Sequence, residues 1–480
     1  MKPASLLRTF ACSTALLSAQ TPDASRMKAD VNLLASLAFE GRMTGTAGQM
    51  KAAKLVAARF RDLGLLPLGT GPDPYFLPYE LEHRTAQEEG SFLSLKDHRV
   101  PLGSGASTFR LSPLTTTLTF LSEGATLAPG NRGGWVAQFV PSGFQAKDGD
   151  ALMYAALSQG ATGVLFLPRP GEDALGPLRN QGVAFILRGR YGFPADGPPP
   201  AGPPEAMVDE ASAKALGLDL PALLRSTSPI NLGSFQIQLH THLDTLRPVN
   251  VAGLLEGSDP KRKDEIIILS AHEDHLGVVN GQMYPGADDN ASGTAVLMEA
   301  ARLLKDTHPR RSILFLSVSG EEEGLFGSRA FMAQPPIPLR RIMADLNTDM
   351  VGRNDVRTLS VTPAAIEGAT GTLTRDARAI AMDLGLTLTD EADDYWKRSD
   401  HYTFAKAGIP SIFFFGGMEP DYHQPSDTPD KVEGEKLAHV TELLTRLALR
   451  VANADTPPRS LPRRAWESWS WPSRLQAPVK

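Results

Sequence analysis

The fold is decided by the stretch Glu265-Ile266-Ile267-Ile268-Leu269-Ser270-Ala271-His272-Glu273-Asp274, an apolar run that ends directly in a histidine and two acidic residues. A short apolar run of this composition is typical of a strand buried on both faces of a parallel sheet. Three more runs have the same form, because His, Asp or Glu follows each within a few residues. These are residues 312–318 before Glu321 and Glu322, residues 342–346 before Asp349, and residues 412–415 before His423.

Four strands that each deliver a ligand-type side chain after their carboxyl end indicate a shared site. In an open α/β sheet, ligands bind in the crevice outside the carboxyl ends of the strands. Imidazole and carboxylate groups gathered there have the composition of a zinc ligand shell. The sequence therefore predicts an α/β fold with a metal site at one edge of its sheet.

The composition is that of an ordinary globular chain. Its 480 residues suffice for two or three domains. The apolar share of 42% and the charged share of 21% are both typical of globular proteins. The net charge of −6 comes without a basic stripe, so no nucleic-acid partner is expected.

The N-terminal residues are typical of an export signal. Lys2 and Arg8 precede a short apolar stretch at residues 10–19 that ends in small residues, and we predict a signal peptide over residues 1–21. The apolar stretch is too short to cross a bilayer. The mature protein is therefore expected to be extracytoplasmic, periplasmic or secreted, without a stable membrane span.

Removal of this signal would also remove Cys12, the only cysteine. Residues 9–11 match a lipoprotein box poorly, and lipid attachment at Cys12 stays open. A mature chain without cysteine has neither a disulfide nor a thiolate ligand, so any metal must be held by His and carboxylate side chains. Such donors are typical of catalytic rather than structural zinc.

The rest of the chain is predicted to form one catalytic domain with an insert. We assign residues 27–111 and 234–455 to the catalytic domain. Residues 112–233 are assigned to a smaller α/β insert without a His and acid cluster, and residues 456–480 to a disordered tail. The expected elements include helices over residues 46–63, 150–159 and 436–453, and strands over residues 135–140, 161–167 and 234–243.

A turn with two consecutive aspartates lies between the first two apolar runs, at residues 284–293. It leads into an amphipathic helix, which Asn290 or Ser292 could cap, and acidic residues are favoured at that end of a helix. Capping accounts less well for Asp288 and Asp289, which follow a Pro-Gly pair. The turn is therefore a candidate source of further ligands.

Five motifs, in this order, closely resemble those of the di-zinc exopeptidase family, which contains secreted leucyl-type aminopeptidases, glutamate carboxypeptidase and glutaminyl cyclases. Two outer features, Glu40-Gly41-Arg42 and Ser399-Asp400-His401, agree as well, and residues 159–164 of the insert resemble a protease-associated domain. The five motifs are Ala271-His272-x-Asp274, Pro285-Gly286-Ala287-Asp288-Asp289-Asn290-x-Ser292-Gly293, Glu321-Glu322-x-Gly324-Leu325-x-Gly327-Ser328, Asp349-Met350-x-Gly352-Arg353 and Tyr422-His423-x-x-x-Asp427-Thr428.

The resemblance implies a fold and a ligand set. The fold is a mixed, mostly parallel sheet flanked by helices, and the cofactor is two Zn²⁺ per chain, which in such sites lie about 3.5–4 Å apart. By the resemblance, Asp288 bridges the two ions. His272 and Asp349 complete the shell of one ion, and Glu322 and His423 complete the other.

The same resemblance implies how the reaction proceeds. Glu321 would be the general base, which takes a proton from the attacking water and returns it to the leaving amine. Asp274 would accept the second ring N–H of His272 and fix its tautomer. The peptide bond between Asp288 and Asp289 is expected to be cis.

The predicted function is that of a secreted zinc-dependent aminopeptidase, which takes peptides with a free N-terminus and hydrolyses the first peptide bond with a water activated by two metals. The alternative is a carboxypeptidase with the same site, for which Arg353 and Arg398 are available to clamp a terminal carboxylate. A glutaminyl cyclase or an inactive binding protein is disfavoured, because no ligand position and no base is replaced. The oligomeric state and the side-chain preference stay open.

Two other histidine motifs are expected to lie outside the site. His242-Leu243-Asp244 falls on the polar face of an alternating strand, and no acidic turn follows it. His401 is expected to support the site or to pack in the core rather than to bind metal.

Overall fold

The computed structural model describes residues 21–103, 105–108, 112–142, 149–172, 175–176, 190–194, 204–279 and 281–460. The predicted signal peptide, apart from residue 21, lies outside the described residues. Along the described part of the chain, no helix combines the length and the apolar character needed to cross a membrane.

The chain divides into two compact units. Unit 1 comprises Met1–Pro78, Pro248–Val278 and Gln282–Lys480, and unit 2 comprises Tyr79–Arg247 and Val279–Gly281. The predicted insert is therefore a separate unit, but its predicted boundaries at residues 112 and 233 are wrong.

The boundaries differ because two long strands of unit 2 pair with each other along their length. Strand β3 (Leu81–Leu95) lies antiparallel to β11 (Ile230–Leu246), from Leu81 opposite Leu246 to Leu95 opposite Phe235. Residues 81–103 and 234–246 therefore fall in unit 2 and not in unit 1.

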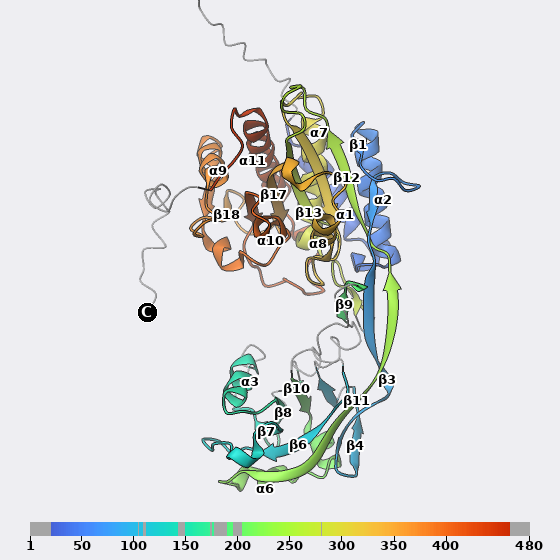
Figure 1. The fold of residues 1–480 in the computed structure, drawn as a ribbon, viewed down its shortest axis with the longest axis vertical. Coiled ribbons are helices and arrows are strands. Elements are labelled where there is room, and N and C mark those ends of the chain that lie inside the picture. The colour runs from blue at the N-terminus through green and yellow to red at the C-terminus, as the bar shows by residue number, and fades with distance from the viewer. Residues whose placement is uncertain are drawn as a thin grey trace, which may run out of the picture. The chain divides into compact units, whose positions relative to one another are not determined.

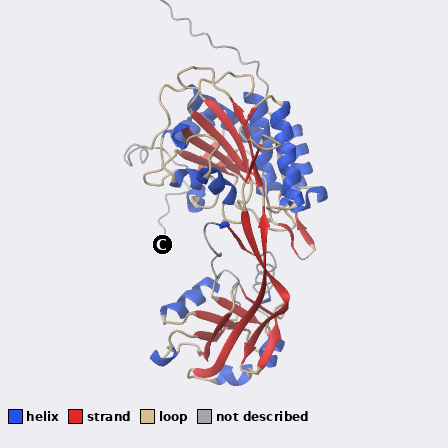
Figure 2. Ribbon diagram, turned by 45° about the vertical axis from the view of Figure 1, so that its right-hand side comes forward, coloured by secondary structure: helices blue, strands red, loops and turns tan. Residues whose placement is uncertain are grey.

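Unit 1 is built on a mixed nine-stranded sheet with helices on both faces (Figures 1 and 2). The centre of the sheet is parallel, in the order β16-β13-β17-β20, and antiparallel strands lie on both sides of it. The predicted fold class is confirmed. The strands are β1 (Leu66–Pro67), β2 (Phe76–Pro78), β12 (Val249–Leu255), β13 (Ile266–His272), β16 (Ser312–Val318), β17 (Ile342–Asp349), β18 (Thr358–Thr362), β19 (Thr387–Thr389) and β20 (Ser411–Phe415).

Alternation along β13 explains why this sheet is covered on both faces. Ile267 and Leu269 belong to a core cluster shared with α1, α2, α7, α9 and α11, whereas Ile266 and Ile268 belong to a second cluster with α8 and α10. An uninterrupted apolar run is the signature of a strand buried on both faces. The helices are α1 (Ala24–Leu34), α2 (Ala47–Asp62), α7 (Gly293–Leu304), α8 (Phe326–Ala333), α9 (Thr372–Asp383), α10 (His401–Lys406) and α11 (Gly434–Asn453).

Short elements connect these strands and helices. The hairpin of β14 (Gly277–Val279) and β15 (Gln282–Tyr284) forms a small sheet of its own. Single helical turns are η1 (Leu37–Arg42), η5 (Ala287–Ser292), η6 (Leu339–Arg341), η7 (Glu391–Tyr395) and η8 (Pro429–Lys431).

Unit 2 has its own nine-stranded mixed sheet and its own core. Ala213 of α5 and Leu220 and Leu223 of α6 belong to one core cluster of this sheet, and Met153 and Ala156 of α3 belong to the other. The predicted helix and strands of this region are all present, with small shifts at their ends. Besides β3 and β11, the elements are β4 (His98–Pro101), β5 (Ala106–Thr108), β6 (Leu114–Phe120), η2 (Pro129–Asn131), β7 (Trp135–Phe139), α3 (Gly149–Ser158), β8 (Gly163–Leu167), β9 (Arg190–Gly192), β10 (Glu205–Val208), α5 (Glu210–Ala215) and α6 (Leu220–Arg225).

The predicted disordered tail begins with ordered residues. The N–H of Thr372 donates to the carbonyl of Arg459 at 2.9 Å, and Ser460 pairs with Gly371. The prediction is therefore wrong for these first tail residues. Residues 461–480 lie outside the described part of the chain.

Candidate metal centre

The four predicted strands bring their carboxyl ends to one edge of the unit 1 sheet. They are neighbours in the order β16-β13-β17-β20 and run parallel, so the loops that follow them meet. His272 ends β13 and Asp349 ends β17, while Glu321 and Glu322 follow β16. His423 lies in the loop after β20.

One group of donors forms around His272, whose side chain is buried. Its Nε2 lies 3.2 Å from Oδ1 of Asp349 and 3.4 Å from Oδ1 of Asp289. A Glu321 oxygen lies within 4.8 Å of donor atoms of His272 and Asp349. The structure thus places His272, Asp349 and Glu321 together, as predicted.

A second group forms around His423. Its Nε2 lies 3.0 Å from Oε2 of Glu322 and 3.2 Å from Oδ2 of Asp289. The imidazole of His275 also belongs to this group, because its Nδ1 lies 2.7 Å from Oε1 of Glu322. The predicted pair of Glu322 and His423 is thus together, with a histidine that the sequence analysis did not assign.

The structure contradicts the predicted role of Asp288. Asp289 turns one carboxylate oxygen toward each of His272 and His423, which is the position of a bridging ligand. Asp288 points elsewhere, and its Oδ1 accepts the N–H of Gly352 at 2.6 Å. Successive side chains of this turn point in different directions. Asp289 therefore faces the two histidines, whereas the carboxylate of Asp288, one residue earlier, binds the backbone. The cis peptide bond is likewise displaced by one residue, to Asp289–Asn290.

Two buried charged residues hold the turn that carries Asp289. The guanidinium of Arg42 donates to the carbonyls of residues 285–286 at 2.8 and 2.7 Å. The carboxylate of Asp427 accepts the N–H groups of Asp288, at 2.9 and 3.1 Å, and of Asp289, at 3.1 Å. Because Asp427 lies four residues after His423, it ties the two loops of the site together.

Asp274 supports His272 in a different way from the one predicted. The ring Nδ1 of His272 lies 3.2 Å from the backbone carbonyl of Asp274 and 3.6 Å from its carboxylate, so the carbonyl is the nearer acceptor. The carboxylate instead accepts the Thr44 hydroxyl at 2.9 Å and the Glu321 N–H at 3.3 Å. Asp274 therefore also fixes the backbone of the predicted base.

The two consecutive glutamates lie in opposite electrostatic surroundings. Burial raises the pKa of Glu321 well above its ordinary value, and the Asp349, Glu322 and Asp400 carboxylates add to this against the opposing effect of His272. Burial also acts on Glu322, but the His423 and His275 rings outweigh it and hold its pKa well below the usual range. Two carboxylates whose pKa values are driven apart are suited to separate roles, one as a proton carrier and one as an anionic ligand.

The spacing of the donors fits two tetrahedral ions that share Asp289. Donors bound about 2.0–2.2 Å from a tetrahedral zinc lie about 3.3–3.6 Å from each other. The four distances between His272 or His423 and their carboxylate partners run from 3.0 to 3.4 Å, at this separation or up to about 0.3 Å below it. His, Asp and Glu donors at this spacing could hold two zinc ions, and no thiolate is required.

Zinc binding to the metal-free protein is expected to release protons. Although burial opposes it, the Glu322 and Asp289 carboxylates raise the pKa of His423 to about 10, and carboxylates likewise raise the pKa of His272. Both rings are therefore protonated near neutral pH and must lose a proton to bind metal, so apparent affinity should rise with pH up to about 10. Calorimetric titration with zinc in two buffers of different ionisation enthalpy measures the released protons. An affinity independent of pH would contradict this ligand assignment.

The two histidines expected outside the site are outside it. His242 lies on β11 in unit 2, is exposed, and pairs with Asp244 at 3.0 Å. His401 is buried and stacks on Phe413 with ring centroids 4.8 Å apart. Burial lowers the pKa of His401 to about 3, so this ring is neutral.

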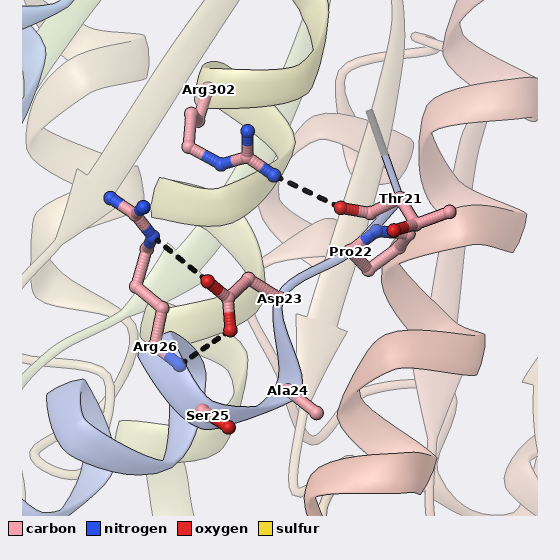
Figure 3. A pocket seen from close by; sticks show the side chains of 7 residues that line it. All are labelled: Thr21, Pro22, Asp23, Ala24, Ser25, Arg26 and Arg302. Atoms are coloured by element: carbon pink, nitrogen blue, oxygen red, sulfur yellow. Dashed lines mark hydrogen bonds and ion pairs between the residues drawn. The ribbon is translucent and has the colours of Figure 1, made fainter. Parts of the chain in front are cut away.

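An open pocket on the surface of unit 1 is unrelated to these donors. It has a volume of about 470 Å³ and is lined by residues 21–26 and Arg302 (Figure 3). Its charged side chains have partners of their own, since Arg26 pairs with Asp23 at 3.7 Å and Arg302 pairs with Glu299 at 2.6 Å. None of the donors discussed above lines it.

Sequence reasoning missed three residues of the site for different reasons. Asp289 was visible as half of an aspartate pair, but the pattern did not say which half faces the metals. His275 lies three residues after His272 and directly after Asp274, and this position in the first motif was the signal that could have identified it. Asp427 was part of a quoted motif, but its role depends on contacts with a turn far away in the sequence.

Comparison with known families shows which proteins this chain resembles. Residues 250–448 match the sequence profile of peptidase family M28. Aminopeptidase YwaD of Bacillus subtilis is 29% identical over 222 residues, which cover 44% of this chain and 46% of that protein. A probable leucine aminopeptidase of Arthroderma otae is 30% identical over 208 residues, which cover 41% of this chain and 57% of that protein. The chain thus spans about half the length of the curated relatives it matches.

Solved structures share the fold over nearly the whole chain. The aminopeptidase from Aneurinibacillus sp. strain AM-1 superposes with a TM-score of 0.59 at 22% identity, covering 92% of this chain and 98% of that one. The zinc aminopeptidase BSAP from Bacillus subtilis gives a TM-score of 0.58 at 22% identity, covering 91% and 96%. At 22% sequence identity, this similarity shows a shared fold.

Proposed function

Residues 250–448 belong to peptidase family M28, and from this premise we propose that the protein is a two-metal aminopeptidase that removes the N-terminal residue of peptides. The observation that carries the proposal is the carboxylate of Asp289, which lies between two histidines at donor distances. The similar proteins are an aminopeptidase, a probable leucine aminopeptidase and a probable zinc metalloprotease, and their names support the same reaction class and the same metal.

In this proposal the two ions are held by five side chains. His272 and Asp349 would hold one ion, Glu322 and His423 would hold the other, and Asp289 would contact both. Three carboxylates offset most of the charge of two divalent cations. Bound zinc would supply Lewis acidity toward the scissile carbonyl and toward the attacking water.

The side chains of the protein would then carry the proton. Glu321 lies beside the His272 group and is one carboxylate more than the ligand set requires. Its raised pKa suits a group that accepts a proton from water and returns it to the leaving amine. Asp274 holds the backbone of Glu321 in place through the N–H of that residue.

The surroundings of Arg353 favour an aminopeptidase over the carboxypeptidase alternative. Its Nη2 already pairs with Asp421 at 3.0 Å and with Glu419 at 3.5 Å, and its Nη1 is buried, so the guanidinium does not offer an open fork of two nitrogens to a substrate carboxylate. Arg398 donates to the Tyr422 hydroxyl at 3.3 Å and would have to act alone. A bidentate clamp typically needs a free guanidinium fork.

We further propose that the protein acts outside the cytoplasm and that unit 2 is a protease-associated domain. The first proposal is supported by the charged and apolar pattern of residues 1–21. The second is supported by the separate core of unit 2 and by the motif at residues 159–164, which includes the start of β8.

The full chain, loaded with zinc, is expected to hold two equivalents of metal and to hydrolyse unblocked Leu-, Ala- or Lys-p-nitroanilide. N-acetylated versions and substrates that report release of a C-terminal Glu should not be turned over, and a chelator should abolish activity. Metal analysis and a chromogenic assay provide the two measurements. One stable equivalent with full activity would exclude the two-metal mechanism, and cleavage at the C-terminus would favour the carboxypeptidase.

A further inference from the structure

His275 occupies a place in the site for which the proposed reaction has no assigned role. Its side chain is fully buried and lies one residue beyond the His272-x-Asp274 motif. Its Nδ1 lies 2.7 Å from Oε1 of Glu322, which is hydrogen-bond distance, and 3.9 Å from Oδ2 of Asp289. The ring therefore faces one particular carboxylate oxygen.

The surroundings of the ring determine how it is oriented and where its proton sits. The ring packs against Gly286, where an added Cβ would come 2.4 Å from the ring Cγ, so glycine at this position makes room for it. Among the described residues, the buried Nε2 has no hydrogen-bond partner. A proton on Nε2 would be buried and unpaired, which is costly, whereas a proton on Nδ1 is paired with Oε1 of Glu322.

The two oxygens of Glu322 thereby acquire different partners. Oε1 accepts the hydrogen bond from His275, whereas Oε2 lies 3.0 Å from Nε2 of His423. The rings of His275 and His423 meet edge to face, with centroids 5.7 Å apart, and each approaches a different oxygen of the carboxylate. Of the two oxygens, Oε2 is therefore the one that lies beside the His423 ring.

We propose that His275 is a positioning residue, whose Nδ1–H holds Oε1 of Glu322 and leaves Oε2 as the single oxygen that contacts the second ion. The inference rests on the proposed two-metal function. A direct ligand role for His275 fits the distances less well. Its 2.7 Å approach to Glu322 is shorter than the about 3.3 Å expected between two donors on one tetrahedral zinc. A carboxylate fixed in this way leaves a coordination position for the reacting groups.

The test compares two variants of the full chain that differ in a single hydrogen-bond donor. His275→Leu keeps a similar volume and removes the donor. His275→Asn places its Nδ2 at the same number of bonds from Cβ as the histidine Nδ1, and so restores the donor. Each protein is titrated with zinc alone against a chromogenic chelator, its cobalt(II) form is examined by visible absorption, and thermal unfolding of the metal-free protein controls for folding.

His275→Leu is expected to weaken binding of the second zinc about 10–100-fold, the usual cost of removing a group that orients a ligand, and to change the cobalt spectrum. His275→Asn should recover most of both. Unchanged affinity in His275→Leu, or an Asn variant as weak as the Leu variant, would overturn the proposal. Complete loss of one metal in both variants would identify His275 as a ligand. None of these measurements uses a substrate, so a wild-type chain that binds two zinc ions without cleaving peptides would refute the proposed function alone.

Discussion

Exchanging Glu321 for Gln is expected to lower kcat for an aminoacyl p-nitroanilide by about 10²–10⁴-fold, the usual effect of losing a general base. Gln keeps the shape of Glu321 and its place beside His272, but it cannot accept a proton from water. The ligand set is untouched, so the variant should retain both metals. Steady-state kinetics and metal analysis on the same preparation provide the measurement.

The neighbouring residue provides the matched comparison for this prediction. Glu322→Gln removes the anion whose pKa is held low by the two facing rings, and it should lower the affinity for one metal rather than only slow turnover. The two variants should therefore separate in a zinc titration, with Glu321→Gln resembling the wild type. An active Glu321→Gln variant would show that another group carries the proton.

The second large effect is expected at Asp289. Its carboxylate is the only one with an oxygen near both His272 and His423 among the residue pairs described, so Asp289→Asn should weaken binding of both metals. We expect the zinc affinity of each site to fall by at least about 10–100-fold, which is the usual loss when a residue that only orients a ligand is removed. Zinc titration monitored by competition with a chelator measures both sites.

Asp288→Asn is the control, one residue away. Burial and the Asp427 carboxylate raise the pKa of Asp288 to about 8, so this group is largely uncharged near neutral pH and Asn removes little charge. The Asn oxygen can still accept the N–H of Gly352. Near-normal zinc affinity in Asp288→Asn beside a large loss in Asp289→Asn is the expected pattern, and the reverse would restore Asp288 as the bridge.

The strands and the helices that cover them could be predicted because their signals are local. Residues 265–274 alone contain the apolar run and the ligands that follow it, and β13 ends at His272 as expected. The domain boundaries could not be predicted in the same way. They depend on the pairing of β3 with β11, two strands about 150 residues apart in sequence, and each strand alone is compatible with either unit.

In the candidate site, too, some residues could be predicted from local sequence and others could not. His272, Glu321, Glu322, Asp349 and His423 could be named because each lies at or after the carboxyl end of one of four strands that run parallel to one another. The sequence could not show whether Asp288 or Asp289 faces the metals, because periodicity does not predict the direction of side chains in an irregular turn.

The sequence by itself therefore determined the class of fold, the edge of the sheet that carries the chemistry, and the kinds of donor gathered there. These follow from apolar periodicity and from the order of strands and polar loops, which are properties of short segments. Only the tertiary structure decided that Asp289 and not Asp288 lies between the histidines, and that His275 faces Glu322. Those outcomes depend on how Arg42 and Asp427 hold the turn from distant parts of the chain, and no short segment contains that information.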